Sequence, residues 1–458
     1  MSTIGLTLVG WTMEHALKQI AIALSALALA STPVLASNFD NEAGLYLLSA
    51  LPDAEREAVR MDRMQLCDQQ PAGLYVRKGE TITISVEAIP EGFYLSAMLG
   101  FRPMWNVPQD QQETQLDEGE NRFTADQDGP LFFKLTSPEG QDAAADEVSL
   151  SVRGGRPLPL YVDGSMDAQD WREELAAHAS APFVQLVGDQ AMITLPAKVH
   201  ASHPIANPQA TFAAINKVLG LENELAGFDG KTPLDQPTPL RQHYLVDFRV
   251  SKKDREGFYM YATDQFIGML PDNTQELTNP QTLRKEWAIW HETGHTHQQH
   301  SWTWEALGEI NVNLFSLYVQ QSFGQPNRLA TSEDGQPTSL ENARDYLANG
   351  ANDFLAEVDD EDGNEFFTRL VMFHQLQSVY GWDLFKDLHK HFRARPLPED
   401  ASDQDKADAF VLALCELTGV DLRAFFETWG LQASAGANKK IERIGYPLPE
   451  EDFSQIFE

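Results

Sequence analysis

The sequence predicts an α+β protein in which an N-terminal β-sandwich precedes a mixed region with a largely helical C-terminal part. Three observations support this. Short apolar runs separated by turn signals occupy the first third, strands and short helices follow, and helical patterns dominate the remainder. We expect four segments: a leader at 1–36, the sandwich at 37–153, a catalytic domain at 154–440 and a tail at 441–458.

Residues 20–36, IAIALSALALASTPVLA, form an apolar stretch of small residues that ends in a typical cleavage site. The stretch predicts a signal peptide cleaved after Ala36, and therefore a secreted or periplasmic protein. An uncleaved membrane anchor is the alternative, which the short length and the Ala and Ser content disfavour. No later segment is long enough to cross a bilayer, so we expect no stable membrane insertion.

The sandwich prediction rests on residues 81–86, where Ile82, Ile84 and Val86 alternate with polar neighbours as in a half-buried strand. Turn signals recur at short intervals up to residue 140, as in a sandwich. Residues 153–159 are the expected linker. The sandwich either binds glycans or only supports the catalytic domain, and the sequence leaves both open.

Composition limits the possible partners. The chain has 34 basic and 68 acidic residues, a formal net charge of -34, which repels phosphate backbones and anionic membranes. Nucleic acid is therefore excluded as an expected partner. Cys67 and Cys415 are the only cysteines, so no disulfide framework supports the fold, and we expect the two thiols to remain unpaired.

The residues from 291 to 295 read HETGH, a complete H-E-x-x-H pattern. On a helix, His291 and His295 project from one face and can hold one zinc ion, and Glu292 lies beside them as a candidate general base. The apolar residues at 283 and 287–289 predict that the motif lies on a buried helix rather than in a loop.

A catalytic zinc site normally takes a third protein ligand and leaves a position for water. Glu309 is our choice, because it shares one helix face with Asn313, whereas the apolar residues Ile310, Leu314, Leu317 and Tyr318 form a core face. Glu305 is the competitor. A three-histidine site of the metzincin type needs Gly at 298 and His at 301, where this chain has Gln298 and Ser301.

Four further residues near the motif each allow two interpretations of their role. His297 lies on the opposite side of the helix and is expected at the surface or as a support for a ligand. Gln298 returns to the metal side, where it orients substrate or a ligand, or is a buried structural amide. Trp302 and Trp304 either stack on sugar rings of a substrate or pack in the core.

The stretches HETGHTHQ at 291–298, WTW at 302–304 and GEINVNLFSLY at 308–318 resemble the enhancin-like zinc metallopeptidases. These are gluzincins, many of them mucin-degrading. Residues 257–270 resemble the strand before the family's zinc helix, and 370–393 and 421–430 resemble its helical C-terminal part. The resemblance covers about residues 155 to 440, and the preceding region resembles the family's N-terminal β-sandwich.

The resemblance implies a gluzincin-type fold, one zinc ion on His291, His295 and Glu309, and Glu292 as the general base. It also implies a secreted endopeptidase that acts on glycoproteins such as mucin-type O-glycosylated chains. A different class remains open, namely a glycan- or mucin-binding adhesin whose zinc site is structural or vestigial. Cleavage-site preference and oligomeric state have no signal in the sequence.

Overall fold

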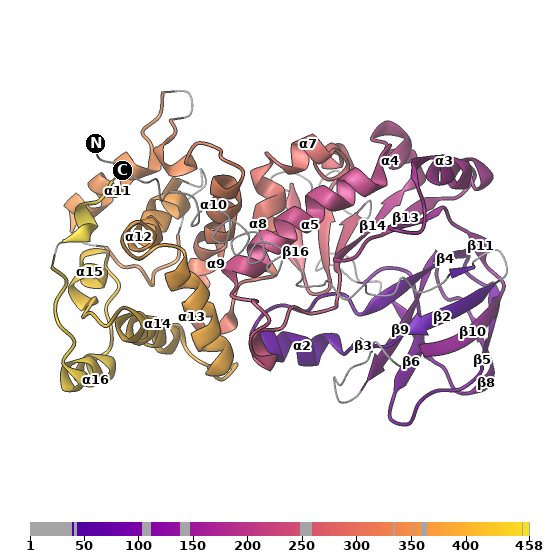
Figure 1. Ribbon diagram of the computed structural model, residues 1–458, viewed down its shortest axis with the longest axis horizontal. Helices are drawn as coiled ribbons and strands as arrows, with labels where there is room; N and C mark the ends of the chain where they lie inside the picture. Colours follow the sequence, from indigo (N-terminus) through magenta and orange to yellow (C-terminus); the bar gives the residue numbers. More distant parts are fainter. Residues whose placement is uncertain are drawn as a thin grey trace, which may run out of the picture.

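The structure is a computed structural model that describes residues 39–40, 44–102, 111–137, 147–247, 259–332, 335–350, 352–358, 364–450 and 452–457. Strands gather in the N-terminal part and helices in the C-terminal part, with a mixed region between them (Figure 1). This arrangement confirms the α+β prediction. The predicted leader lies outside the described residues. Within the described part, no helix has the length and apolar character that a bilayer span requires.

Two sheets built mainly from antiparallel strands form the N-terminal region. The first has the order β1 (Phe39–Asp40), β2 (Leu45–Ser49), β10 (Glu147–Arg153), β5 (Thr81–Val86) and β8 (Gly119–Thr124). The second has the order β11 (Arg156–Pro157), β4 (Gln69–Val76), β9 (Gly129–Ser137), β6 (Tyr94–Leu99) and β7 (Gln112–Gln115), with β3 (Leu51–Pro52) parallel to β9.

The two sheets enclose one apolar core, to which β2, β5 and β10 contribute from one sheet and β4, β6 and β9 from the other. The alternating side chains of Ile82, Ile84 and Val86 are at most 3% exposed and face this core, as their pattern predicts. The expected linker at 153–159 is part of the folded structure, because β11 pairs with β4 and Leu158 is fully buried.

The mixed region is built on a six-stranded sheet with the order β12 (Leu160–Val162), β13 (Phe183–Val187), β14 (Ala191–Pro196), β15 (Gln242–Val246), β17 (Phe266–Met269) and β16 (Met260–Thr263). The pairs β12 with β13, β14 with β15 and β15 with β17 are parallel. The pairs β13 with β14 and β16 with β17 are antiparallel. In the described part of the sheet, β16 is therefore the edge strand that lies beside the helices.

Helices surround this sheet and make up the C-terminal part of the molecule. The helices up to the metal motif are α2 (Ala54–Met61), α3 (Ala168–Ala177), α4 (Ala197–Ser202), α5 (Pro208–Leu225), α6 (Gln275–Thr278), α7 (Pro280–Leu283) and α8 (Trp287–His295). Those after it are α9 (Gly308–Asn311), α10 (Asn313–Ser322), α11 (Ser339–Asn349), α12 (Asn364–Tyr380), α13 (Asp383–Ala394), α14 (Asp403–Thr418), α15 (Arg423–Thr428) and α16 (Ala435–Ile444).

Short 3-10 turns connect these helices, namely η2 (Pro233–Asp235), η3 (Pro271–Asn273), η4 (His300–Trp302), η5 (Glu305–Leu307), η6 (Arg328–Ala330) and η7 (Phe453–Gln455). Local sequence explains several helix boundaries. The side chain of Asn207 caps α5, and Pro208 occupies its first turn, where a missing N–H costs nothing. Ser402 and Asp405 form a capping box on α14, and Gly419 ends that helix with a φ of 69°.

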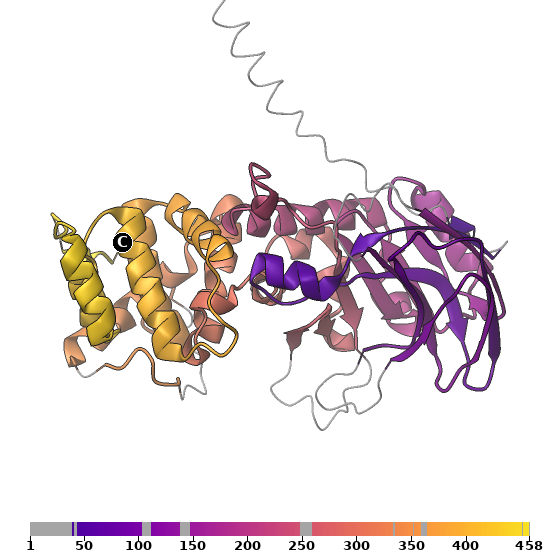
Figure 2. The same cartoon turned by 90° about the horizontal axis from the view of Figure 1, so that it is seen from below.

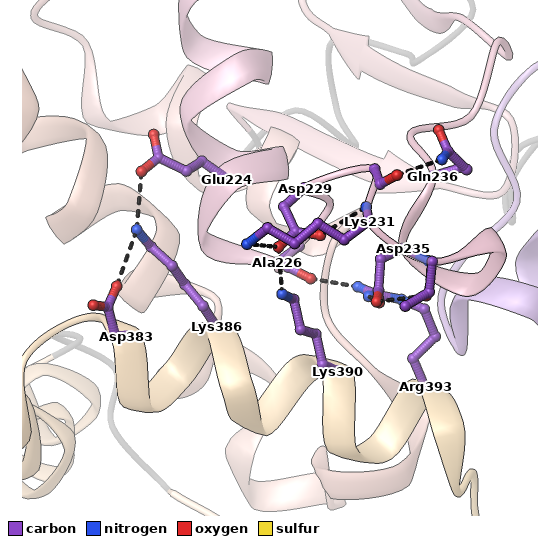
Figure 3. A network of polar contacts seen from close by, with 12 residues as sticks. Glu224, Ala226, Asp229, Lys231, Asp235, Gln236, Asp383, Lys386, Lys390 and Arg393 are labelled. Atoms are coloured by element: carbon purple, nitrogen blue, oxygen red, sulfur yellow. Dashed lines mark hydrogen bonds and ion pairs between the residues drawn. The ribbon is translucent and has the colours of Figure 1, made fainter. Parts of the chain in front are cut away.

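A row of ion pairs joins α13 to the end of α5 and the loop after it (Figure 3). Lys386 Nζ lies 2.9 Å from Glu224 Oε1, and Lys390 Nζ lies 2.6 Å from Asp229 Oδ2. The third pair joins Arg393 Nη1 to Asp235 Oδ1 at 2.6 Å, and here the arginine is nearly fully buried. The C-terminal helices are thereby attached to the region that carries the metal motif.

The structure corrects the expected C-terminal tail and agrees with the expectation for the two cysteines. The boundary at residue 440 falls inside α16, Ile441 is fully buried, and the side chain of Gln375 donates to the backbone of Ser454. The last residues therefore pack into the helical region rather than form a separate tail. Cys67 and Cys415 are both buried and unpaired, as expected.

Candidate functional site

The side chains of His291, His295 and Glu309 converge. Glu309 Oε2 lies 3.0 Å from His291 Nε2 and 3.6 Å from His295 Nε2. Their ligand atoms all lie within 4.8 Å of one another, and among the described residues no other histidine, cysteine and carboxylate group of this kind occurs. The spacing of four on α8 places both imidazoles on one face, and α9 supplies the carboxylate. The competitor Glu305 is exposed on η5, outside this cluster.

Hydrogen bonds fix which nitrogen of His291 is free. Its Nδ1 lies 2.9 Å from Asn313 Oδ1, and Trp287 Nε1 donates to the same oxygen at 2.9 Å. An indole N–H can only donate, so this atom of Asn313 is the oxygen, and the His291 Nδ1 must carry a proton to bond to it. The Nε2 is therefore the ring nitrogen of His291 that faces Glu309 and can ligate a metal ion. Asn313 Nδ2 also donates to the Glu309 backbone oxygen at 2.9 Å.

His295 is oriented in the same way by Gln298. The His295 Nδ1 lies 2.7 Å from Gln298 Oε1, and Gln298 Nε2 donates to the Gly308 carbonyl at 2.6 Å and to Asn311 Oδ1. The two acceptors around Gln298 Nε2 fix the orientation of the Gln298 amide, so its Oε1 faces His295 and the His295 Nδ1 is the donor. Gln298 thus orients His295, which agrees with one of its two expected roles, the orientation of a candidate ligand.

The donor set fits a divalent cation. Two imidazole Nε2 atoms 3.1 Å apart and a carboxylate oxygen face one another, and three acceptor atoms in this arrangement repel unless a positive charge lies between them. Two nitrogens and one oxygen are the ligands of many catalytic zinc sites, which keep a further position open. The Glu309 side chain is 54% exposed, so this arrangement faces solvent on one side.

Glu292 lies beside the cluster against the edge strand. The backbone N–H of Ala262 on β16 donates to its carboxylate. Burial raises the pKa of Glu292 above its ordinary value, and His291 and His295 oppose this shift. A raised pKa suits a carboxylate that must accept and return a proton near neutral pH.

The glycine of the motif allows close packing behind the site. A Cβ added to Gly294 would lie 3.1 Å from Val312 Cγ2 and 3.2 Å from Phe315 Cβ. These residues are at the start of α10, which crosses α8 closely because position 294 has no side chain. The same contact brings Glu309 and Asn313, which flank Val312, to the metal face.

Two expectations for the residues after the motif are corrected. His297 is 2% exposed, not at the surface: its Nδ1 contacts the Thr293 carbonyl at 3.0 Å, and its Nε2 contacts Asn223 Oδ1 at 3.1 Å. Trp302 and Trp304 are each 1% exposed and pack against Phe410. Their rings are enclosed by the core, so neither has a free face on which a sugar could stack.

Sequence reasoning missed three contributors to the site. Asn313 orients His291 directly, and Asn311 orients His295 through Gln298. Ala262, on β16, contacts Glu292. Only Asn313 left a signal, because it lies four residues after Glu309 and shares its face. The other contacts depend on how separate elements pack.

Known proteins share this architecture. The chain is 25% identical over 309 residues to the TRPM8 channel-associated factor homolog of Xenopus laevis, which covers 67% of this chain and 31% of that protein. It is 27% identical over 353 residues to the putative lipoprotein AcfD homolog of Escherichia coli strain K12, which covers 68% of this chain and 22% of that protein. The chain therefore spans about a third or less of these two relatives.

The matches to solved structures span most of this chain and most of the matched chain. A functionally unknown conserved protein, in a mutant form, from Bacillus anthracis str. Ames matches 90% of this chain and 80% of its own, with 27% identity and a TM-score of 0.76. A metallopeptidase in complex with Tn antigen matches 91% and 80%, with 19% identity and a TM-score of 0.75. The latter identity establishes a common fold alone.

A family model matches the part of the chain that holds the candidate metal ligands. It describes peptidase M60, enhancin and enhancin-like proteins, and it matches residues 154–430, which is more than half of the chain. The match includes α8, α9 and the edge strand, and so all the residues that converge at the site. The chain therefore belongs to the peptidase M60 family of enhancin and enhancin-like metallopeptidases.

Proposed function

We propose that this chain is a secreted zinc endopeptidase that cleaves glycoproteins, with mucin-type O-glycosylated chains as substrates. The observation that carries the proposal is the site itself: two imidazoles whose Nε2 atoms converge with the Glu309 carboxylate, and a separate, partly buried Glu292 beside them. A purely structural zinc site usually has four protein ligands and needs no adjacent carboxylate.

His291, His295 and Glu309 would hold the zinc ion, which when bound supplies a Lewis acid that activates water and polarises the scissile carbonyl. Glu292 accepts the proton of the attacking water and delivers it to the leaving amine. General acid and base catalysis of this kind typically contributes about 100- to 10,000-fold. The Ala262 N–H keeps the Glu292 carboxylate in place while the proton is held there.

The edge strand supports an extended peptide as the substrate. β16 ends the described part of the sheet, and a peptide that pairs with an open sheet edge gains main-chain hydrogen bonds without regard to its side chains. Because Ala262 on β16 contacts Glu292, a chain paired there would lie with its backbone beside the general base.

The glycoprotein part of the proposal draws on the related proteins. The structurally similar metallopeptidase was solved in complex with Tn antigen, and one relative is named a putative lipoprotein, which agrees with export.

The test uses the full chain with one mucin-type glycoprotein, in its glycosylated and its enzymatically deglycosylated form, with and without chelator. We expect chelator-sensitive cleavage of the glycosylated form only. Glu292→Gln should retain one zinc ion and lose cleavage, since the amide cannot accept the proton. Cleavage by Glu292→Gln at the wild-type rate would contradict the assigned base. Glycoprotein binding without any cleavage by the wild type would favour the adhesin alternative.

A further inference from the structure

A cavity of about 650 Å³ adjoins the metal cluster on the side of His295 and Gln298. Its walls come from separate parts of the chain: α2 and the residues just after it, the β16–β17 turn, the loop that follows α8, and the segment after α13. In both views of the molecule, α2 lies between the N-terminal strands and the C-terminal helices (Figures 1 and 2). The N-terminal region thus reaches the catalytic part of the molecule.

The connection after α2, residues 62–65, is fixed at one end to the loop that follows the metal helix. The Asp62 carbonyl accepts from the His300 N–H at 2.9 Å, and Asp62 Oδ2 accepts from the Ser301 N–H at 3.1 Å. Asp62 adopts a left-handed conformation with a φ of 55° while making these bonds, a geometry that costs a non-glycine residue about 1 kcal/mol or more.

The other end of this connection is fixed to the turn that follows the edge strand. The Gln65 N–H donates to Asp264 Oδ1 at 3.1 Å, and the Gln265 N–H donates to the Gln65 carbonyl at 2.8 Å. Between the two ends, the Arg63 guanidinium is 5.1 Å from the centroid of the Phe228 ring, which Arg393 of α13 also contacts at 3.9 Å. The wall formed by α2 is therefore joined by hydrogen bonds to the loop after α8 and to the turn after β16.

Strand direction tells which part of a substrate meets this cavity. Antiparallel pairing is the more common and slightly more stable arrangement, and a chain that pairs with β16 in this way places its N-terminal part over the C-terminal end of that strand. Asp264, which directly follows β16, lines the cavity. The residues that precede the scissile bond would then lie over the cavity.

We propose that this cavity is the subsite for the substrate residues on the N-terminal side of the scissile bond, and that α2 of the N-terminal region forms the wall that limits what enters it. The proposal rests on the proposed function. It makes the N-terminal region part of the catalytic cleft rather than an accessory. Val59 and Glu55 lie one helical turn apart on α2 and both line the cavity, and Val59 is 66% exposed.

Charge adds a preference to this size limit. Glu55 and Glu399 are exposed and line the cavity, and in the described part of the chain neither forms an ion pair. The basic residue of the lining, Arg63, is 8% exposed. An acidic side chain in the cavity would meet two uncompensated carboxylates, whereas a basic one would be attracted.

The test first maps one cleavage site of the wild type in a mucin-type glycoprotein, then uses synthetic glycopeptides that span this site. Val59→Trp narrows the cavity from an exposed position, and Arg56→Trp is the matched control, because Arg56 is exposed on the same helix and does not line the cavity. We expect Val59→Trp to raise the KM of the full-length glycopeptide at least tenfold. It should leave the zinc content unchanged, and should leave the KM of a glycopeptide shortened on the N-terminal side within twofold.

The outcomes separate this proposal from the previous one. If the wild type cleaves the glycoprotein and Val59→Trp behaves like Arg56→Trp on both peptides, the subsite is wrong while the peptidase stands. If Val59→Trp impairs only peptides extended on the C-terminal side, the strand direction is wrong. If the wild type cleaves nothing, the peptidase proposal fails and the subsite falls with it. A glycopeptide with Glu immediately before the scissile bond should have a lower kcat/KM than the same glycopeptide with Lys at that position. Glu55→Gln should reduce this difference in kcat/KM.

Discussion

The orientation of His291 by Asn313 makes the clearest quantitative prediction. Asn313→Ala removes the acceptor of the His291 Nδ1 proton and of the Trp287 Nε1 proton. Loss of a partner that orients a metal-binding histidine typically lowers metal affinity about 10- to 100-fold, which is about 1.4 to 2.7 kcal/mol. His291 and Trp287 are both partly accessible, so water can replace some of the lost bonds. We therefore expect the metal-free protein to lose only about 1 kcal/mol of stability.

The assay is a zinc competition titration against a chromophoric chelator, with denaturant unfolding of the metal-free protein alongside. Asn349→Ala, at the exposed end of α11, is the control and should match the wild type in zinc affinity. Asn313→Asp keeps an acceptor for the His291 Nδ1 proton and should retain more affinity than Asn313→Ala. Wild-type zinc affinity in Asn313→Ala would refute the argument that this amide selects the tautomer of His291.

Three further predictions concern the third metal ligand, the loss of folding stability at acidic pH and a contact in the core. Glu309→Ala should lose zinc while Glu305→Ala retains it, as metal analysis of the purified variants would measure; the reverse result would move the site. Burial lowers the pKa of His389 from 6.5 to about 3, so the unfolded chain takes up a proton below pH 6.5 that the folded chain refuses. Stability should fall as the pH drops from 6.5 towards 3, and His389→Leu should reduce this slope by up to about 1.4 kcal/mol per pH unit in denaturant unfolding; an unchanged slope would contradict the assignment. Phe228→Ala should cost about 3 kcal/mol, since the ring is 8% exposed between two arginines, and unfolding within 1 kcal/mol of wild type would count against that packing.

Much of the candidate site is local in the sequence, and this is why it could be predicted. His291 and His295 are four residues apart on a helix whose apolar positions are evident, and helical geometry alone puts them on one face. Glu309 could be selected over Glu305 because helical spacing groups it with Asn313 opposite the core face. The alternation at Ile82, likewise, predicts one buried face of a strand.

The alternatives that the structure excludes share a physical cause. Trp302 and Trp304 lie near the motif in sequence, but an aromatic residue can be buried or exposed, and only the packing of α14 against η4 decides between the two. His297 was expected at the surface or as a support for a ligand, because it lies on the helix side opposite His291 and His295. In the structure it is buried, and Asn223 of α5 supplies its polar partner. Polarity in a sequence does not reveal whether another element brings a partner.

The sequence by itself determined the residue types of the site, their spacing within two short helices, and the α+β order of the chain, because each of these depends on periods of two to four residues. Tertiary structure alone decided that Glu309 meets the histidines, that Ala262 holds Glu292, and that residues 62–65 join the metal loop to the edge strand. These contacts connect segments up to 239 residues apart. Their geometry follows from how whole sheets and helices pack, which no local pattern records.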